Sequence, residues 1–145
     1  MNNEKDNVYD LVEDFYAHDE GWNTLLRQEY AEGFLRMEAW KGKKNSDLYR
    51  SWDNLTMLCL YLGSAETFLG DMNADDFIDC IAWCGRNISE FTPDYKNTQD
   101  FLETCDGLFK YLKGKNAISN DTVPATAAEI LLQEGNEYNF TGWKL

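Results

Sequence analysis

The amino-acid sequence predicts an all-α protein, and three of its features support this class. Helix-breaking residues are few, with only 2 Pro and 10 Gly among 145 residues. Apolar residues recur along most of the chain with the spacing of amphipathic helices. The hydrophobic fraction is 43% and includes 8 Phe, 8 Tyr and 5 Trp, which is enough to bury a core without disulfides. We therefore expect a single domain, residues 1–145, folded as a bundle of about six helices.

An N-terminal helical extension, residues 1–45, is expected to hold two of these helices. Over residues 7–18, apolar side chains recur at positions i, i+3, i+4 and i+7, namely Val8, Leu11, Val12 and Phe15. Gly21 interrupts this pattern, and a second apolar stripe over residues 22–40 predicts the next helix. The polar run KGKKNS, residues 41–46, then predicts a loop.

The core helices are expected in residues 46–120, and the first of them runs from Asp47 to Leu69. Its apolar face is wide and comprises Leu48, Trp52, Leu55, Leu58, Cys59, Tyr61, Leu62, Phe68 and Leu69. Gly70 is the expected stop, because glycine readily adopts the left-handed conformation that ends helices. So wide a face predicts that this helix lies at the centre of the bundle.

Two further core helices have clear start signals. Asn73 is a good N-cap for a helix that has Asp76 at its third position, where an acid is favoured by the helix dipole. Thr92 and Pro93 predict the N-cap and the first residue of the next helix. This helix is expected to end at Gly114.

The C-terminal helix and tail occupy residues 121–145. Thr126 and Glu129 fit a capping box, which predicts that the last helix begins after Thr126. Gly135 is the expected stop, and the aromatic tail from Asn136 is expected to pack on this chain or on another. The oligomeric state stays open, because wide apolar stripes serve a core and a dimer interface equally well.

The charge is acidic along the whole chain. The 26 Asp and Glu against 13 Lys and Arg give a net charge of −13. Such a surface repels nucleic-acid phosphates and attracts basic proteins. The first residues are polar, and no apolar run approaches the length of a membrane span. We therefore expect a cytoplasmic protein with reduced cysteines that does not enter a membrane.

The segment DMNADDFIDCIAWC, residues 71–84, partly matches a calcium-binding EF-hand loop. The first three ligand positions are matched by Asp71, Asn73 and Asp75. The sixth position needs Gly and is Asp76, and the twelfth needs Glu and is Ala82. We therefore interpret these acids as the first turn of a helix.

No catalytic, metal-binding or cofactor-binding residue is predicted, and we expect a protein that is not an enzyme. His18 is the sole histidine and stands at a helix end, where the dipole favours a cation. Core packing is favoured over a zinc site for the four cysteines, which lack a C-x2-C pair: Cys59, Cys80, Cys84 and Cys105. Catalysis by carboxylates alone stays an alternative for Glu29, Glu32 and Glu38.

Two groups of lysines stand out from the acidic background. One follows Trp40 and consists of Lys41, Lys43 and Lys44. The other surrounds Tyr111 and consists of Lys110, Lys113 and Lys115. Lysines near helix C-termini are favoured by the helix dipole, which explains both groups without a ligand. Phosphate contact is the alternative interpretation.

Three stretches between residues 47 and 120 form a characteristic succession, LYRSWDNLTMLCLYLGSAETFLG, MNADDFIDCIAWC and YKNTQDFLETCDGLFKYLKGKNAISND. The last of them closes on Leu108, Phe109, Tyr111, Leu112, Gly114 and Ile118. This succession resembles the N-terminal core-binding domain of tyrosine recombinases. The resemblance implies a SAM-like helical bundle for the central part, and contact with DNA. The family's catalytic arginine, histidine and tyrosine belong to a second domain that no part of this chain resembles.

Three functions follow as hypotheses. The first is a non-enzymatic interaction protein that docks on a basic protein surface and, as a DNA mimic, acts as an inhibitor of a nucleic-acid-binding enzyme. Its contacts are expected among clustered acids, Glu13, Asp14, Asp75, Asp76 and Asp79. The alternative is a stand-alone or degenerate recombinase-like core-binding domain that contacts DNA through Lys110, Lys113 and Lys115. An enzyme or metal protein that uses the cysteines is the third hypothesis, which elemental analysis for zinc would test.

Overall fold

The computed structural model describes residues 7–18 and 21–134, and all regular structure within these two ranges is helical. The elements follow one another as α1 (Val8–His18), α2 (Trp22–Leu25), α3 (Gln28–Trp40), α4 (Asn45–Ala65), the 3₁₀ turn η2 (Leu69–Asp71), α5 (Ala74–Asn87), α6 (Tyr95–Gly114) and α7 (Val123–Glu134). The predicted all-α class is confirmed. Among the described helices, none is both long and apolar enough to cross a membrane.

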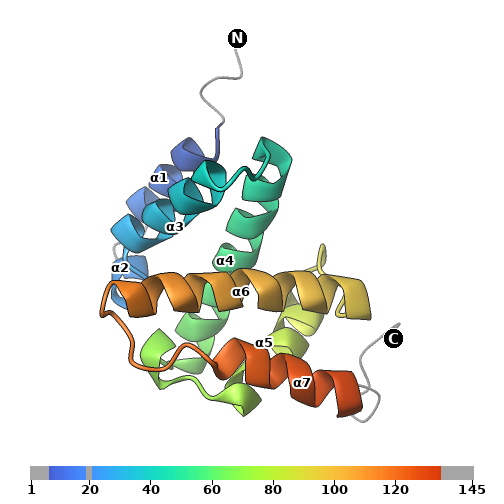
Figure 1. Cartoon of the computed structure of the whole chain (residues 1–145). Coiled ribbons are helices and arrows are strands. Elements are labelled where there is room, and N and C mark those ends of the chain that lie inside the picture. Colours follow the sequence, from blue (N-terminus) through green and yellow to red (C-terminus); the bar gives the residue numbers. More distant parts are fainter. Residues whose placement is uncertain (1–6, 19–20, 135–145) are drawn as a thin grey trace.

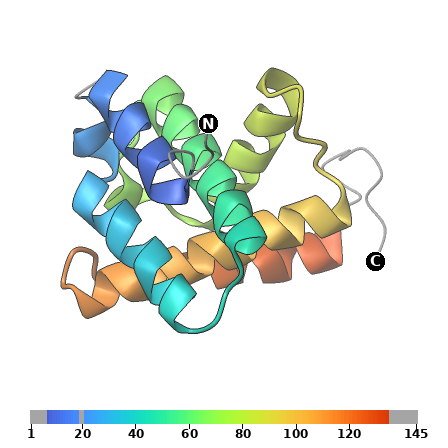
Figure 2. The ribbon, with the colours of Figure 1, turned by 90° about the horizontal axis from the view of Figure 1, so that it is seen from above.

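Helices α4 and α6 form the centre of the bundle. α4 packs against α1, α2, α3, α5 and α6, and α6 also packs against α3 and α7. Figure 1 shows α6 crossing in front of α4, with α1, α2 and α3 to one side and α5 to the other. α7 runs antiparallel to α6, and the view from above places it beneath that helix (Figure 2). The predicted central position of the long helix is confirmed.

The core is apolar and rich in aromatic rings. Phe77 of α5 and Phe109 of α6 are fully buried, and their rings lie edge to face with centroids 5.5 Å apart. In the N-terminal part, Phe15 stacks on Trp22 at 4.9 Å and meets the edge of Trp52 at 5.3 Å. These ring contacts hold α1 and α2 against α4, so the predicted N-terminal extension packs on the core helices.

Two glycines allow α3 and α6 to approach closely. A Cβ atom on Gly33 would collide with the Tyr111 hydroxyl, and one on Gly107 would lie 3.1 Å from the Phe34 ring. Each helix thus presents a glycine to an aromatic ring of the other. The two rings also meet edge to face, with centroids 6.3 Å apart.

The prediction of one continuous helix over residues 22–40 is wrong, because the structure divides this segment into α2 and α3. Leu26 is extended (φ −150°) and buried, and its carbonyl accepts a hydrogen bond of 2.6 Å from the Tyr16 hydroxyl. The Asn23 side chain accepts from the backbone N–H of Gln28 at 2.8 Å, which supplies a partner at the start of α3. Local periodicity does not predict this break, because part of it depends on a contact with α1.

The long helix ends at Ala65, so the predicted end at Leu69 with Gly70 as the stop is wrong. Glu66 adopts the left-handed conformation (φ 54°), and its N–H donates to the carbonyl of Leu62. Leu69 then lies buried in η2. The chain therefore leaves the helix early and still buries this leucine in the core.

The predicted start of α6 is also displaced. Asp94 is the N-cap in place of Thr92, because its Oδ1 accepts the backbone N–H of Asn97 at 2.8 Å. Pro93 lies outside the helix and packs on Gly85 of α5. The proline therefore fixes the loop before α6, and it does not form the first helical turn.

The last helix begins at Val123, upstream of the predicted cap Thr126. The Thr126 hydroxyl donates to the carbonyl of Thr122 at 3.1 Å from within the helix, so the predicted capping box is wrong. The expected stop at Gly135 and the expected packing of the tail from Asn136 lie outside the described residues.

The acidic segment 71–84 begins a helix, as predicted. Asn73 Oδ1 accepts the N–H of Asp76, and Asp76 Oδ2 accepts the N–H of Asn73, both at 2.9 Å. This is a reciprocal capping box at the start of α5. The Asp76 carboxylate therefore takes part in the N-terminal cap of its own helix.

Candidate functional site

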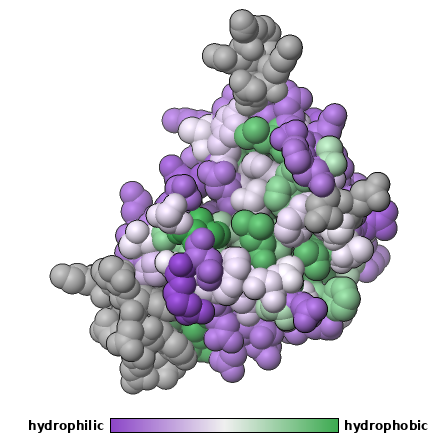
Figure 3. Space-filling view, turned by 180° about the vertical axis from the view of Figure 1, so that it is seen from behind, coloured by the Kyte–Doolittle hydropathy of each residue, from purple (hydrophilic) through white to green (hydrophobic). Residues whose placement is uncertain are grey.

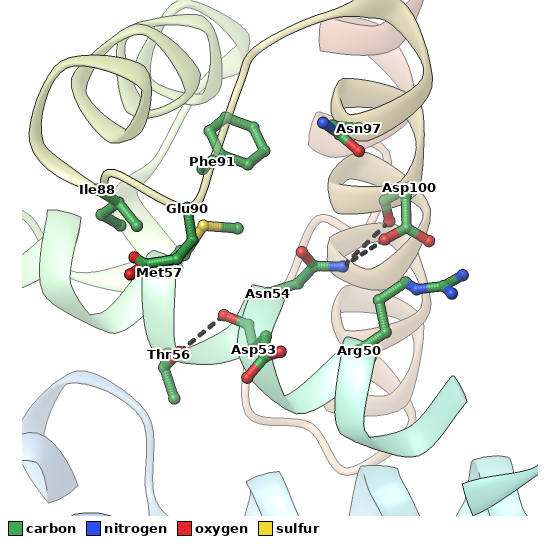
Figure 4. A pocket seen from close by; sticks show the side chains of 10 residues that line it. All are labelled: Arg50, Asp53, Asn54, Thr56, Met57, Ile88, Glu90, Phe91, Asn97 and Asp100. Atoms are coloured by element: carbon green, nitrogen blue, oxygen red, sulfur yellow. Dashed lines mark hydrogen bonds between the residues drawn. The ribbon is translucent and has the colours of Figure 1, made fainter. Parts of the chain in front are cut away.

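A hollow of about 420 Å³ opens between α4, the loop after α5 and the first turns of α6 (Figure 4). We call it the α4–α6 hollow. It is lined by Arg50, Asp53, Asn54, Thr56 and Met57 of α4, by Ile88, Glu90 and Phe91 of the loop, and by Asn97 and Asp100 of α6. Its volume falls within the range of small-ligand sites, about 300–1,000 Å³.

One side of the hollow is apolar. Met57 is buried in α4, and Ile88 and Phe91 are half-buried in the loop after α5. The Phe91 ring lies 6.4 Å from that of Phe101, so the core supports it. Figure 4 shows these three apolar side chains on one side of the hollow and Asp100 on the other.

The loop that carries Phe91 is held by contacts of the two residues that follow this phenylalanine. Pro93 lies so close to Gly85 that a Cβ atom there would stand 2.8 Å from the proline ring. The Asn97 side chain donates to the carbonyl of Thr92 at 2.9 Å. The loop is thus fastened to both α5 and α6, and the shape of the hollow depends on these contacts.

Asn54 links α4 to α6 and also faces the hollow. Its side chain is almost fully buried, with 5% of the residue exposed. The Nδ2 group donates to Asp100 Oδ2 at 3.1 Å and to Thr104 Oγ1 at 2.9 Å. With both donor hydrogens directed at α6, the Oδ1 acceptor points into the hollow (Figure 4) and receives no hydrogen bond from the described residues.

The charged groups of the hollow are three carboxylates and one guanidinium. Asp53, Glu90 and Asp100 supply the negative charge. Asp53 is exposed as a whole residue, and partial desolvation against the hollow raises the pKa of its carboxyl group above the ordinary value. Arg50 forms no ion pair within the described part of the chain. Figure 4 shows its guanidinium extending away from Ile88 and Met57.

Two further hollows, of about 540 Å³ and about 210 Å³, adjoin the first, because Arg50 and Asp100 line all three. Together they form a groove along α4 and α6 that we call the acidic groove. The cations that line it are Lys43, Arg50 and Lys96. The more numerous carboxylates are Glu38, Asp47, Asp53, Glu90, Asp100 and Glu103.

The acids predicted to contact a partner form two separate groups, and neither lines the groove. Exposed acids of α1 form the first group, Glu13 and Asp14, and acids of α5 form the second, Asp75, Asp76 and Asp79. α1 packs on α3 and α4, whereas α5 packs on α4 and α7, and the two helices lie apart in both views (Figures 1 and 2). The structure therefore does not gather these five residues into one surface.

The lysines predicted to contact DNA are exposed, and each has a neighbouring side chain. Lys110 donates to Asp106 at 2.7 Å, and Lys113 lies 3.8 Å from Asp121. The ammonium group of Lys115 lies 5.5 Å from the centroid of the Tyr111 ring. Two of the three positive charges are thus offset by carboxylates. The second lysine group, Lys41, Lys43 and Lys44, has no ion pair in the described residues and follows Trp40, which is 86% exposed.

The four cysteines are buried in the core, as predicted: Cys59, Cys80, Cys84 and Cys105. Burial raises the pKa of Cys59 to about 12 and also raises the pKa of Cys80 and Cys105. These thiols are therefore protonated at neutral pH. In the part of the chain that the structure describes, no group of three or more His, Cys, Asp or Glu side chains is placed to hold a metal ion.

The remaining acids considered for catalysis lie on α3, and His18 is exposed at the end of α1. Glu29 pairs with Arg27, and Glu32 accepts from Gln28 at 3.0 Å. Glu38, in contrast, lines one end of the acidic groove. Glu29 and Glu32 therefore take part in contacts with neighbouring side chains, and Glu38 belongs to the groove.

The residues of the hollow were not predicted from the sequence, although one polar residue in an apolar helix face points to them. Asn54 interrupts the apolar face of α4 between Trp52 and Leu55, and a buried amide in such a position requires a hydrogen-bond partner. The identity of that partner, Asp100, comes only from the crossing of α4 and α6.

Comparisons with known proteins yield no relative for this chain: no family model, no curated protein and no solved structure matches it.

Proposed function

We propose that this protein is a non-enzymatic interaction protein that binds a basic surface of another protein through the acidic groove. The observation that supports this proposal is the combination of groups in the groove. Carboxylates outnumber cations there, and an apolar wall stands beside them. Lysine and arginine side chains match such a lining, because they carry a charged head on an apolar stem.

The charge of the whole chain supports the same partner class. With a net charge of −13, the protein attracts a basic surface at long range, which raises the rate of encounter. Basic protein surfaces often serve nucleic-acid binding, and an acidic protein that covers one competes with phosphate. Inhibition of a nucleic-acid-binding enzyme is therefore the biological role that we propose.

The test compares binding of a fluorescently labelled arginine-rich peptide with binding of a labelled DNA duplex. We expect the peptide to bind, and the double variant Glu90→Gln with Glu103→Gln to weaken that binding roughly tenfold, the loss of about 1.4 kcal/mol. The control variant, Asp75→Asn with Asp79→Asn, removes the same charge from α5 and should retain most of the affinity. Equal losses in both variants would contradict the groove as the contact.

The recombinase-like alternative predicts the opposite preference. Under it, the duplex binds, the binding weakens steeply with added salt, and replacement of Lys110, Lys113 and Lys115 by alanine abolishes it. That result, together with no binding of the peptide, would overturn the proposed function. The ion pairs of Lys110 and Lys113 favour the protein partner.

A further inference from the structure

We infer that the α4–α6 hollow receives the side chain of an arginine residue from the basic partner. This inference rests on the proposed function and specifies which chemical group the groove recognises. Three observations support it: Asn54, Asp53 and Glu90 offer hydrogen-bond acceptors to the hollow, apolar side chains form one of its sides, and its carboxylates do not converge on a point.

Apart from the Arg50 guanidinium, which extends away from the apolar side chains, the free hydrogen-bonding groups of the hollow are mainly acceptors. Asn54 directs both of its donor hydrogens to α6, so only Oδ1 faces the hollow. The carboxylates of Asp53 and Glu90 make no ion pair within the described residues. A guanidinium group has five N–H donors and no acceptor, so it complements this set.

The apolar wall distinguishes a long side chain from a small cation. Met57, Ile88 and Phe91 offer a surface on which the methylene stem of an arginine can pack. Phe91 also presents an aromatic ring, on which a planar guanidinium stacks better than the ammonium group of lysine. The carboxylate of Asp53, which lines the same hollow, gains a counter-charge when the cation enters.

The positions and signs of the charges argue against a metal ion and against an anion as the ligand of the hollow. In the described residues no three ligating side chains are placed around a common metal position, so a compact divalent cation does not match the hollow. An anion would have only Arg50 as a cationic partner, against three carboxylates. A cation that extends over several atoms matches both the charge and the separation of the acceptors.

The inference is tested by NMR titration of the ¹⁵N-labelled full-length protein with three short peptides, acetyl-Gly-X-Gly-amide with X as arginine, lysine or citrulline. Citrulline has nearly the shape of arginine but no charge. We expect the arginine peptide to shift the side-chain amide signals of Asn54 and the backbone signals of Glu90 and Phe91. The citrulline peptide should leave them unchanged, and the lysine peptide should bind several-fold more weakly.

Matched variants locate the site. Asp53→Asn with Glu90→Gln should raise the Kd of the arginine peptide about tenfold or more, whereas Asp75→Asn with Asp79→Asn, which loses the same charge elsewhere, should change it less than twofold. Shifts confined to α5, or equal binding of the three peptides, would overturn the inference. If the arginine-rich peptide of the previous section still binds in that case, the proposed function stands; if no basic peptide binds, both fail.

Discussion

Two buried threonines of α6 differ in what their hydroxyl groups contact. Thr104 Oγ1 accepts a hydrogen bond from Asn54 at 2.9 Å and donates to the carbonyl of Asp100 at 3.2 Å. Thr98 Oγ1 is buried and finds no hydrogen-bond partner among the described residues. A buried polar group without a partner costs about 1–3 kcal/mol, so the two hydroxyls have opposite effects on stability.

Replacement of each threonine by the similarly shaped valine tests this difference. Thr98→Val should raise the free energy of unfolding by about 1 kcal/mol, because it removes the unpaired hydroxyl. Thr104→Val should lower it by about 1–3 kcal/mol, because it leaves a donor of Asn54 unpaired. Urea denaturation followed by circular dichroism measures both values. Destabilisation by both substitutions would show that the Thr98 hydroxyl has a partner in solution.

The buried thiols give a second prediction for single residues. Since burial raises the pKa of Cys59, Cys80 and Cys105, and only thiolates react readily, we expect the native protein to resist alkylation by a thiol reagent at pH 8. In concentrated urea, all four cysteines should react. Mass spectrometry counts the modified thiols under the two conditions. Rapid modification of a cysteine in the native protein would contradict its burial.

At the scale of elements, the close approach of α3 and α6 depends on glycine. Gly33→Ala places a methyl group against Tyr111, so we expect it to lower the free energy of unfolding by about 1–3 kcal/mol. Gly63→Ala is the matched control, because a Cβ atom at this exposed position of α4 lies 3.5 Å from its nearest neighbour, Trp22. The control should gain about 0.5–1 kcal/mol from helix propensity. Equal effects in thermal unfolding would contradict the contact.

The helix ends show which local signals are reliable. Asn73 caps α5 as expected, because both partners of its capping box lie within one turn of the chain. The break after α2 differs, because the Leu26 carbonyl accepts from Tyr16, which belongs to another helix. A local capping pair therefore makes a helix boundary accessible from sequence, as at Asn73, but it does not always select the boundary, since Asp94 caps α6 where Thr92 was predicted.

At the scale of the whole molecule, the burial of several cysteine thiols predicts a loss of stability at alkaline pH. In the unfolded chain a thiol has a pKa near ~8.5, whereas burial raises the pKa of Cys59 to about 12 in the folded state. The unfolded state therefore loses its proton first as the pH rises. The free energy of unfolding therefore decreases as the pH rises from ~8.5 to the pKa of the thiol in the folded protein. The decrease is up to about 1.4 kcal/mol per pH unit for such a thiol.

We therefore expect the free energy of unfolding to fall between about pH 8.5 and pH 11. Cys80 and Cys105 contribute in the same direction, because burial raises the pKa of each thiol. Urea denaturation at several pH values, with a reducing agent present, measures the slope. A flat profile over this window would show that the thiols ionise as easily in the folded protein as in the unfolded chain.

The charge of the molecule is distributed in a way that matters for the proposed function. Most acids are spread over the surface, and Figure 3 shows hydrophilic side chains around a few exposed hydrophobic ones on the face opposite to that of Figure 1. Carboxylates, an apolar wall and a buried amide acceptor occur together in the acidic groove. Under the proposed function, the overall charge favours encounter with any basic protein, and the groove is the expected site of the specific contact.

The sequence by itself determined the helical class, the central position of the long helix, the capped start of α5 and the burial of the four cysteines. These features depend on hydrophobic periodicity and on capping partners within one or two helical turns, so neighbouring residues in the sequence are enough to predict them. It also showed the acidic character of the molecule, but the acids that it singled out, such as Glu13 and Asp75, lie outside the groove.

Only the tertiary structure decided where α2 ends, where α4 ends and which acids share one site. Asn54 and Asp100 are 46 positions apart in the chain and become neighbours only where α6 crosses α4. Glu90 lines the same hollow from the loop after α5, which Pro93 fastens to Gly85 of that helix. The site arises from the packing of three elements, and no local pattern records how distant elements pack.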